Sequence, residues 1–318
     1  MRILALLLLA LSAQMARADG DALSWLARIH VATQKLSYTG TFVYRSGEQS
    51  ETSRIVHVVG RNGTRERLET LDGHPREIVR SGDEVKCYLP ESMTIKVDTQ
   101  TDHKVFPSFM PESLQDIAEH YDVRTGAIER IAGYDCQTIV LLPKDKLRYG
   151  RRLWADAKTG MLLKSQILND RNEPIEQFTF TQISIGGKID HNQLKSRLLA
   201  KSRDWHVEQS GAISASLAAS GWTINPELPG FRKVTEMKRT QGGSNEVGHV
   251  VYSDGLAAVS VFIEPIAGKT SLPPAGLSRQ GAINIYSRQV ADNLVTVVGE
   301  APGDSVRKLA ESVEYSAP

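Results

Sequence analysis

Few residues of this 318-residue chain have the types and spacing that catalysis or metal binding requires. The sequence contains no Gly-x-Ser-x-Gly, His-Glu-x-x-His or paired Cys-x-x-Cys motif, and no glycine-rich phosphate loop. His57 lies in an apolar run that predicts a partly buried histidine bonded to a neighbour, and His120 lies on a short helix where a surface position is expected. We therefore expect no enzyme, no metal site and no cofactor, with an unrecognised hydrolase as the weakest alternative.

Cys87 and Cys136 are the two cysteines of the chain. In an oxidising compartment they can pair, and closing a loop of about 50 residues would stabilise the fold by roughly 4 kcal/mol. Both cysteines also lie in strand-like runs, VKCYLP and YDCQTIVLLP, which suit two buried free thiols. The sequence leaves a disulfide and free thiols open.

The densest group of cations precedes a predicted β-hairpin. This basic patch consists of Lys144, Lys146, Arg148, Arg151 and Arg152. It predicts either a solvated loop or a site for an acidic peptide or for lipid head-group phosphates. Over the whole chain 38 Lys and Arg balance 37 Asp and Glu, which gives no reason to expect a nucleic-acid partner.

The hairpin itself, RYGRRLWADAKTGMLLKSQILND, spans residues 148–170, and its turn is predicted at Asp156–Gly160. Both of its faces are apolar, whereas a half-solvated hairpin is apolar on one face only. Either a curled sheet encloses an apolar hollow for an amphiphile, or these residues are ordinary core. The candidates to line the hollow are Phe42, Tyr44, Leu153, Trp154 and Leu162.

Hydrophobic periodicity predicts an α+β protein with two domains. A helix over 21–36, ten or eleven short strands with turn signals between them, and a short helix over 114–120 describe a large antiparallel sheet. Such a sheet must curl, with the helices filling its mouth. We assign residues 19–200 to this half-barrel, 201–220 to a linker, and 221–318 to a small α+β domain.

The N-terminus predicts export. Arg2, the apolar run 3–11 and Ala16-Arg17-Ala18 form a secretory signal peptide over residues 1–18, so the mature chain should begin at Asp19. No later run approaches the roughly 18 apolar residues of a membrane-spanning helix. We expect a protein of the bacterial periplasm, soluble once the signal peptide is removed.

Several segments in order along the chain resemble the RseB/MucB family, the periplasmic negative regulators of the sigma-E envelope-stress response. Besides the hairpin, they are GTFVY (40–44), LDGHPREIVR (71–80), LPGF (228–231), YSDGLAAVSVFIEP (252–265) and VTVVGE (295–300). The resemblance covers both predicted domains. It implies a half-open β-barrel like those of the lipoprotein carriers LolA and LolB, followed by a small C-terminal domain.

The resemblance also implies a function by binding. Family members bind the periplasmic part of the anti-sigma factor RseA or MucA and hinder its cleavage by the site-1 protease DegS, and lipopolysaccharide or mislocalised lipoprotein releases them. The expected seat of the anti-sigma peptide is the small domain and the cleft beside it. The positions concerned are Trp222, Phe231, Tyr252, Phe262 and Glu264.

Alternation along residues 258–264 limits this peptide site. Val259, Val261 and Ile263 share one face of a strand, and Phe262 and Glu264 lie on the other, so one set must be core. A lipid or lipoprotein carrier of LolA type is the alternative function, although a carrier needs no second domain. The sequence leaves the oligomeric state open, a homodimer included.

Overall fold

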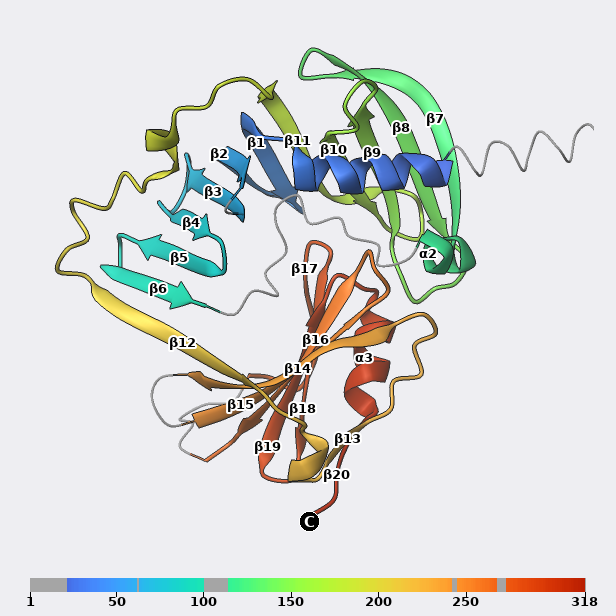
Figure 1. Cartoon of the computed structure of the whole chain (residues 1–318). Coiled ribbons are helices and arrows are strands. Elements are labelled where there is room, and N and C mark those ends of the chain that lie inside the picture. The colour runs from blue at the N-terminus through green and yellow to red at the C-terminus, as the bar shows by residue number, and fades with distance from the viewer. Residues whose placement is uncertain (1–21, 62, 100–113, 242–244, 268–272, 318) are drawn as a thin grey trace, which may run out of the picture.

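The computed structural model describes residues 22–61, 63–99, 114–241, 245–267 and 273–317. The expected signal peptide lies outside the described residues. Figure 1 shows a large, open, curled sheet with a helix across it, and a smaller sheet below with one helix on a face. The α+β fold class expected from the sequence, a curled half-barrel joined to a small α+β domain, is confirmed.

Eleven antiparallel strands form the large sheet. Hydrogen bonding orders them β7–β8–β9–β10–β11–β1–β2–β3–β4–β5–β6, so the first strand lies in the middle. Their bounds are β1 Tyr38–Ser46, β2 Gln49–Gly60, β3 Gly63–Thr70, β4 Glu77–Ser81, β5 Glu84–Leu89, β6 Thr94–Asp98, β7 Tyr121–Ile131, β8 Tyr134–Pro143, β9 Gly150–Asp156, β10 Leu162–Leu168 and β11 Pro174–Ile185.

The turn between β9 and β10 forms as its sequence predicts. The Asp156 carboxylate accepts hydrogen bonds from the N–H (2.8 Å) and the hydroxyl (2.6 Å) of Thr159. Gly160 has a φ of +78°, and a Cβ added there would lie 3.0 Å from the carbonyl oxygen of Arg28. Arg28 in turn donates to the carbonyl of Ala157 at 2.9 Å, so this turn is held against the helix over residues 22–35.

Both apolar faces of this hairpin are buried. Leu153 pairs across the sheet with Ile139 and Ser165, and Trp154 pairs with Thr138 and Lys164. Because side chains alternate along a strand, Leu153 and Trp154 point to opposite faces of the sheet. Leu153 is fully buried and Trp154 is 2% exposed. Trp25, Leu26 and Ile29 of the helix over 22–35 belong to the same core cluster. The hairpin is therefore core on both sides.

The two cysteines are free, which settles against a disulfide. Cys87 lies on β5 and Cys136 on β8. Seven strands (β9, β10, β11, β1, β2, β3 and β4) lie between β8 and β5 in the sheet order. Neighbouring strands are about 4.8 Å apart, and a disulfide needs Cα atoms within about 7 Å of each other.

The small domain is a six-stranded antiparallel sheet with a helix packed on one face. Its order is β14–β15–β16–β19–β18–β17, with bounds β14 Arg232–Gln241, β15 Asn245–Ser253, β16 Ala258–Pro265, β17 Gly276–Gln280, β18 Ile283–Val290 and β19 Asn293–Gly299. Helix α3 (Gly303–Glu311) buries Val306, Leu309 and Ala310 in this core. Val259, Val261 and Ile263 are the buried face of β16, as one of the two alternation patterns required.

The segment expected as a linker contains a strand. Strand β12 (His206–Ser214) pairs in parallel with β6 through residues 206–210, and antiparallel with β14 through 211–214. Figure 1 shows it running from the edge of the large sheet down to the small one. Val207 and Ile213 are 49% and 71% exposed, so backbone pairing rather than side-chain burial holds this strand.

The described chain also contains a short helix, two short strands and two 3-10 helices, His191–Leu194 and Ala218–Ser220. Helix α2 (Leu114–His120) forms where the sequence predicts it, and β13 (Trp222–Ile224) pairs with β20 (Val313–Tyr315) beside the small sheet. Among the residues that the structure describes, no helix has both the length and the apolar character needed to cross a membrane.

Candidate functional site

Arg148 lies at the centre of the contact between the two domains. Its side chain is fully buried, and its guanidinium donates to Asp254 Oδ2 of the small domain at 3.3 Å. It also donates to Asp145 Oδ1 at 3.2 Å and to the carbonyl of Pro229. The Tyr121 hydroxyl donates to the same Asp254 oxygen at 3.1 Å. A buried cation of the large domain is thus matched by a buried anion of the small one.

A second cation of the large domain makes a similar contact. Arg151 is 8% exposed and donates to Glu300 Oε2 at 2.9 Å and to the carbonyl of Leu256 at 2.8 Å, both in the small domain. At the surface the small domain supplies the cation and the large domain the anion, because Arg232 of β14 pairs with Asp116 of α2 at 3.0 Å. The three pairs fix the orientation of the small domain by charge as well as by shape.

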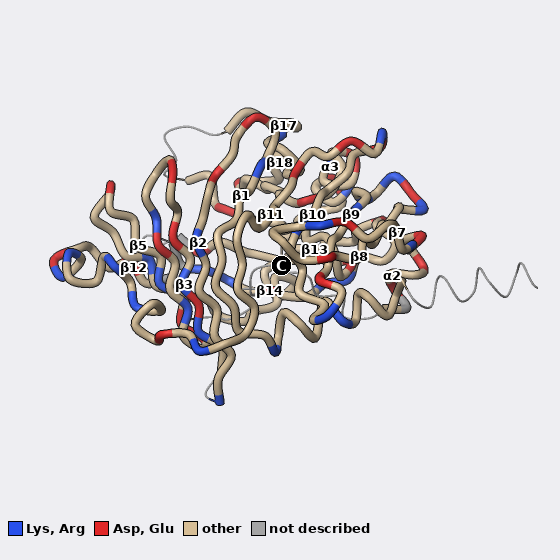
Figure 2. Tube along the Cα trace, turned by 90° about the horizontal axis from the view of Figure 1, so that it is seen from above, with Lys and Arg blue, Asp and Glu red and all other residues tan. Residues whose placement is uncertain are grey.

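Two arginines of the basic patch are therefore not available to an external anion. Arg148 and Arg151 are buried because carboxylates more than 100 residues away in sequence pair with them. Arg152 lies over the Trp154 ring, with its guanidinium carbon 6.0 Å from the ring centroid, whereas Lys144 and Lys146 are exposed. Figure 2 shows Lys and Arg interspersed with Asp and Glu along β2, β3 and β5 rather than gathered on one face.

Four of the five residues expected to line an amphiphile hollow are core residues. Phe42, Leu153, Trp154 and Leu162 are at most 4% exposed and share one cluster, because the helix over 22–35 and both faces of the β9–β10 hairpin fill the space. The fifth, Tyr44, lines a cavity. The hollow predicted around Trp154 is thus filled with protein side chains.

The Tyr44 cavity lies between the two domains. Its volume is about 800 Å³, and Leu89 and Pro75 of the large domain and Ile283 of the small domain supply apolar walls. Charged groups at this cavity are paired with each other: Arg76 donates to Glu51 Oε1 at 3.2 Å. The space is large enough for a ligand and joins surfaces of both domains.

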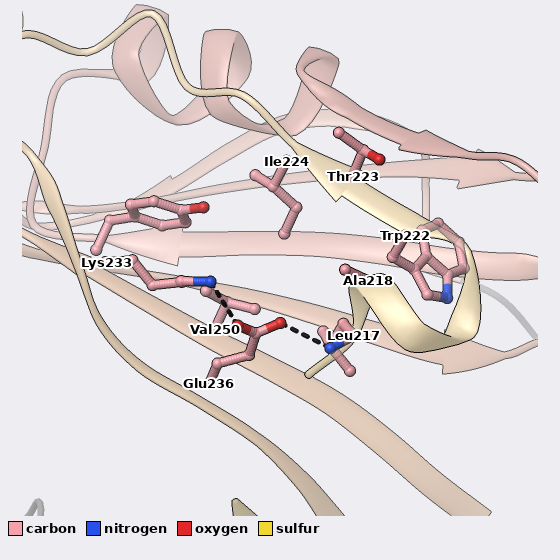
Figure 3. Close-up of a pocket in the computed structure, with 9 residues that line it drawn as sticks. Leu217, Ala218, Trp222, Thr223, Ile224, Lys233, Glu236 and Val250 are labelled. Atoms are coloured by element: carbon pink, nitrogen blue, oxygen red, sulfur yellow. Dashed lines mark hydrogen bonds and ion pairs between the residues drawn. The ribbon is translucent and has the colours of Figure 1, made fainter. Parts of the chain in front are cut away.

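A smaller pocket of about 190 Å³ lies in the small domain, between the segment that follows β12 and the sheet. Figure 3 shows Trp222, Val250 and the short 3-10 helix Ala218–Ser220 around it. The pocket also contains a charged pair, in which Lys233 donates to Glu236 Oε2. Its lining residues are Leu217, Ala218, Trp222, Thr223, Ile224, Lys233, Glu236, Val250 and Tyr252.

Glu236 ties this pocket to the preceding segment. Its other carboxylate oxygen accepts the backbone N–H of Leu217 at 2.7 Å. Burial acts to raise the pKa of Glu236, but the hydrogen bonds from Lys233 and from the Leu217 N–H outweigh it, so this pKa is lowered. The pocket therefore combines an apolar wall with an ionised carboxylate and a lysine at its rim.

The five residues expected to seat a peptide do not form one site. Trp222 and Tyr252 meet at the small pocket. Phe231 is buried at the domain interface, 5.2 Å from the Arg148 guanidinium carbon. Phe262 and Glu264 lie on the opposite face of the sheet from Val261, and the Phe262 ring stacks on His249 at 4.4 Å. Of the five, Trp222 and Tyr252 line the same cavity in the described part of the chain.

The sequence did not point to the other residues of the small pocket. Leu217 and Ala218 fall in the segment read as a linker, and Lys233 and Glu236 lie on a strand with no distinguishing motif. The i, i+3 spacing of Lys233 and Glu236 is the one available signal, and it is common on protein surfaces.

His57 is packed and bonded within the large sheet. It is 1% exposed, its Nδ1 lies 3.0 Å from Glu66 Oε2, and the Tyr38 ring stacks on it at 4.9 Å. The predicted bond to a neighbour is confirmed, and the side chain is almost fully rather than partly buried. Among the described residues, no group of three or more His, Cys, Asp and Glu side chains is placed to hold a metal ion.

Fold and interface together define a two-domain protein, in which a curled half-barrel is joined to a small α+β domain through one buried ion pair, one partly exposed ion pair and a shared strand. The chain belongs to the MucB/RseB family. The family model for the MucB/RseB N-terminal domain matches residues 21–198, and the model for the MucB/RseB C-terminal domain matches residues 216–314. The resemblance noted in the sequence is confirmed.

Relatives of this chain are named as regulatory proteins. The sigma factor AlgU regulatory protein MucB of Pseudomonas aeruginosa is 33% identical over 322 residues, covering 99% of this chain and 97% of that protein. The sigma-E factor regulatory protein RseB of Escherichia coli (strain K12) is 25% identical over 298 residues, covering 92% and 90%.

The fold also matches solved structures. The MucA/MucB complex of Pseudomonas aeruginosa superposes with a TM-score of 0.71 at 29% identity, covering 94% of this chain and all of that chain. A structure of MucB in complex with MucA(peri) superposes with a TM-score of 0.70 at 30% identity, covering 93% and 100%.

Proposed function

We propose that this chain is a periplasmic negative regulator of a sigma-E type envelope-stress response. It binds the periplasmic part of a membrane-spanning anti-sigma factor of the RseA/MucA type and shields it from site-1 proteolysis. Lipopolysaccharide or the acyl chains of mislocalised lipoprotein release it. The regulator acts by binding alone, after export and removal of the signal peptide.

One observation carries this proposal. The match to the MucB/RseB family extends over both domains, and the structure that matches this chain over 94% of its length is a MucB bound to MucA. The second domain is held in a fixed orientation by the Arg148–Asp254 and Arg151–Glu300 pairs. A carrier of the LolA type needs no such domain.

The small pocket is the proposed seat for an apolar side chain of the anti-sigma factor. Trp222, Val250 and Tyr252 offer an apolar wall, and Lys233 and Glu236 at the rim can pair with charges on either side of the inserted residue. Filling the pocket should then weaken binding without disturbing the core. Ala218 is exposed and lines the pocket, which makes Ala218→Phe the suitable variant.

The test is calorimetric titration of the mature chain with the periplasmic segment of the same organism's anti-sigma factor. Micromolar or tighter binding that weakens when lipopolysaccharide is added supports the regulator and its linkage to an amphiphile. Ala218→Phe should lose at least about tenfold in affinity, equal to about 1.4 kcal/mol. Ala219→Phe, an exposed neighbour outside the pocket lining, is the matched control and should bind normally.

Two outcomes count against parts of this proposal. No binding with or without amphiphile, together with stoichiometric co-purified lipid, would favour the carrier. Normal affinity of Ala218→Phe would leave the regulator standing and reject the pocket as the seat of the peptide.

A further inference from the structure

The tip of the β17–β18 hairpin rests directly on the large domain. Ala282 at this tip is fully buried, and a methyl group added to Gly281 would overlap the Ser46 hydroxyl oxygen at the end of β1. Gln280 donates to Gln49 Oε1 at 3.3 Å across the same contact. We call this contact, made by residues 280–282 on residues 46–49 and on Glu176, the hairpin seat.

Glu176 lies beneath the hairpin seat, in an environment that opposes a negative charge. It is on β11 opposite Ser46, it is 9% exposed, and its Oε2 atom is buried without a hydrogen-bond partner in the described part of the chain. The Ala282 N–H of the small domain and the Tyr44 hydroxyl of the large domain both act to favour the ionised form of this carboxylate, so both lower its pKa. Both domains thus contribute to the surroundings of this one carboxylate.

The charges around Glu176 are unbalanced. Glu300 faces it from the small domain, and Arg151 on β9 is the cation that acts on both carboxylates. Arg151 donates one hydrogen bond to Glu300 at 2.9 Å and a second to the Leu256 carbonyl at 2.8 Å. Two carboxylates, Glu176 at 9% exposure and Glu300 at 37% exposure of its side chain, therefore share one arginine.

We propose that the hairpin seat is a proton-sensitive contact between the two domains, which a proton on Glu176 strengthens and ionisation of Glu176 weakens. The separated domains would return Glu176 to water and remove Glu300 from it. The contact form therefore holds the proton more tightly than the separated form, so by linkage acid favours contact.

The direction of the Glu176 pKa agrees with this geometry. Burial first, and then repulsion from Glu300, raise the pKa of Glu176 above its ordinary value, against the opposing effects of the Tyr44 hydrogen bond, Arg151 and the Ala282 N–H. Stabilisation of the hairpin seat is therefore fully present below the ordinary carboxyl pKa and is lost as pH rises through the raised one. This inference goes beyond anti-sigma binding, because protonation of Glu176 changes the stability of the contact between the two domains.

Hydrogen exchange of the mature chain tests the proposal. Protection of residues 280–283, corrected for the intrinsic pH dependence of exchange, should rise in the wild type as pH falls from about 8 to about 5. In Glu176→Gln it should become independent of pH over this range, and at the upper end it should exceed that of the wild type. Glu173→Gln, an exposed carboxylate close by in the chain, should keep the wild-type response.

A second variant gives a readout that a merely structural role would not move. Tyr44→Phe removes the hydroxyl that favours the ionised form of Glu176, so the midpoint of the protection profile should shift to higher pH. Amides of α3, buried within the small domain, serve as the internal reference for global unfolding. A wild-type profile that does not change with pH, or a Glu176→Gln variant that keeps the wild-type profile, overturns the proposal.

Discussion

The strongest test of the interface is to remove the charge of Asp254. Asp254→Asn keeps the shape of the side chain and the oxygen that accepts the N–H groups of Leu256 (2.9 Å) and Ala257 (2.8 Å). It leaves Arg148, whose side chain is fully buried, without its buried anionic partner. The change therefore isolates the ion pair from the local turn that Asp254 also stabilises.

The expected loss follows from what remains around Arg148. Breaking a buried pair by removing one partner costs about 3–5 kcal/mol. Asp145, 3.2 Å away and 29% exposed on its side chain, and the Pro229 carbonyl still accept from the guanidinium. We therefore expect a loss of about 3 kcal/mol, at the lower end of that range, equivalent to roughly a hundredfold in the unfolding equilibrium.

A double-mutant cycle on urea unfolding measures the pair itself. Arg148→Met should also cost about 3 kcal/mol, because it leaves Asp254 buried and charged. Arg148→Met combined with Asp254→Asn leaves neither charge, so its loss should fall short of the sum by about 2 kcal/mol. Fluorescence and circular dichroism transitions must coincide before a free energy is assigned to a two-domain chain.

The matched control crosses the same interface at the surface. Asp116→Asn removes the partner of Arg232, which is 69% exposed on its side chain, and should cost less than about 1 kcal/mol. Additivity of the Arg148 and Asp254 losses within about 0.5 kcal/mol, or a loss for Asp254→Asn no larger than that for Asp116→Asn, would refute the argument that burial makes this pair decisive.

Three single positions give further predictions. Burial, with Arg239 acting in the same sense, lowers the pKa of His249 from 6.5 to about 4. The stability contributed by neutral His249 is therefore fully present above pH 6.5 and falls by roughly 3 kcal/mol as pH drops toward 4. His249→Phe should make the unfolding temperature less dependent on pH over that range, and the same pH dependence in variant and wild type would contradict this. Trp154, at 2% exposure, makes Trp154→Glu a buried carboxylate that should cost more than about 4 kcal/mol, and a variant that folds with the wild-type melting temperature would show that the side chain is not core. A Cβ on Gly40 would lie 2.7 Å from the Gln182 carbonyl oxygen, so Gly40→Ala should cost about 1–3 kcal/mol in thermal unfolding, whereas Gly211→Ala, with nothing within 4 Å, should be nearly neutral.

Features set by neighbouring residues could be predicted from the sequence. The turn at Asp156–Gly160 forms because an aspartate and a glycine with positive φ suffice to build it. Helix α2 begins and ends where predicted, at Leu114 and His120. The core face of β16 follows from strict alternation, once the strand is known to be covered on one side.

Features set by distant partners could not be predicted. Arg148 and Arg151 read as an exposed patch because their carboxylates lie 106 and 149 residues further along the chain. Strand β12 had no two-residue period to reveal it, because neither of its faces is consistently buried and its pairing partners are edge strands of two different domains. The position of the small pocket depends on the same segment, through Leu217 and Ala218.

Polarity at the interface explains why the domains meet in one orientation. The large domain contributes buried cations at Arg148 and Arg151, and the small domain contributes the matching anions at Asp254 and Glu300. A displaced small domain would leave a buried charge unpaired, which is more costly than losing apolar contact. Glu176 works against this closure, because it adds a second carboxylate for the same Arg151. The preference of the two domains for contact over separation is therefore a difference between the favourable ion pairs and the unfavourable second carboxylate. A ligand that contacts both domains can shift this equilibrium through a modest difference in its affinity for the two states.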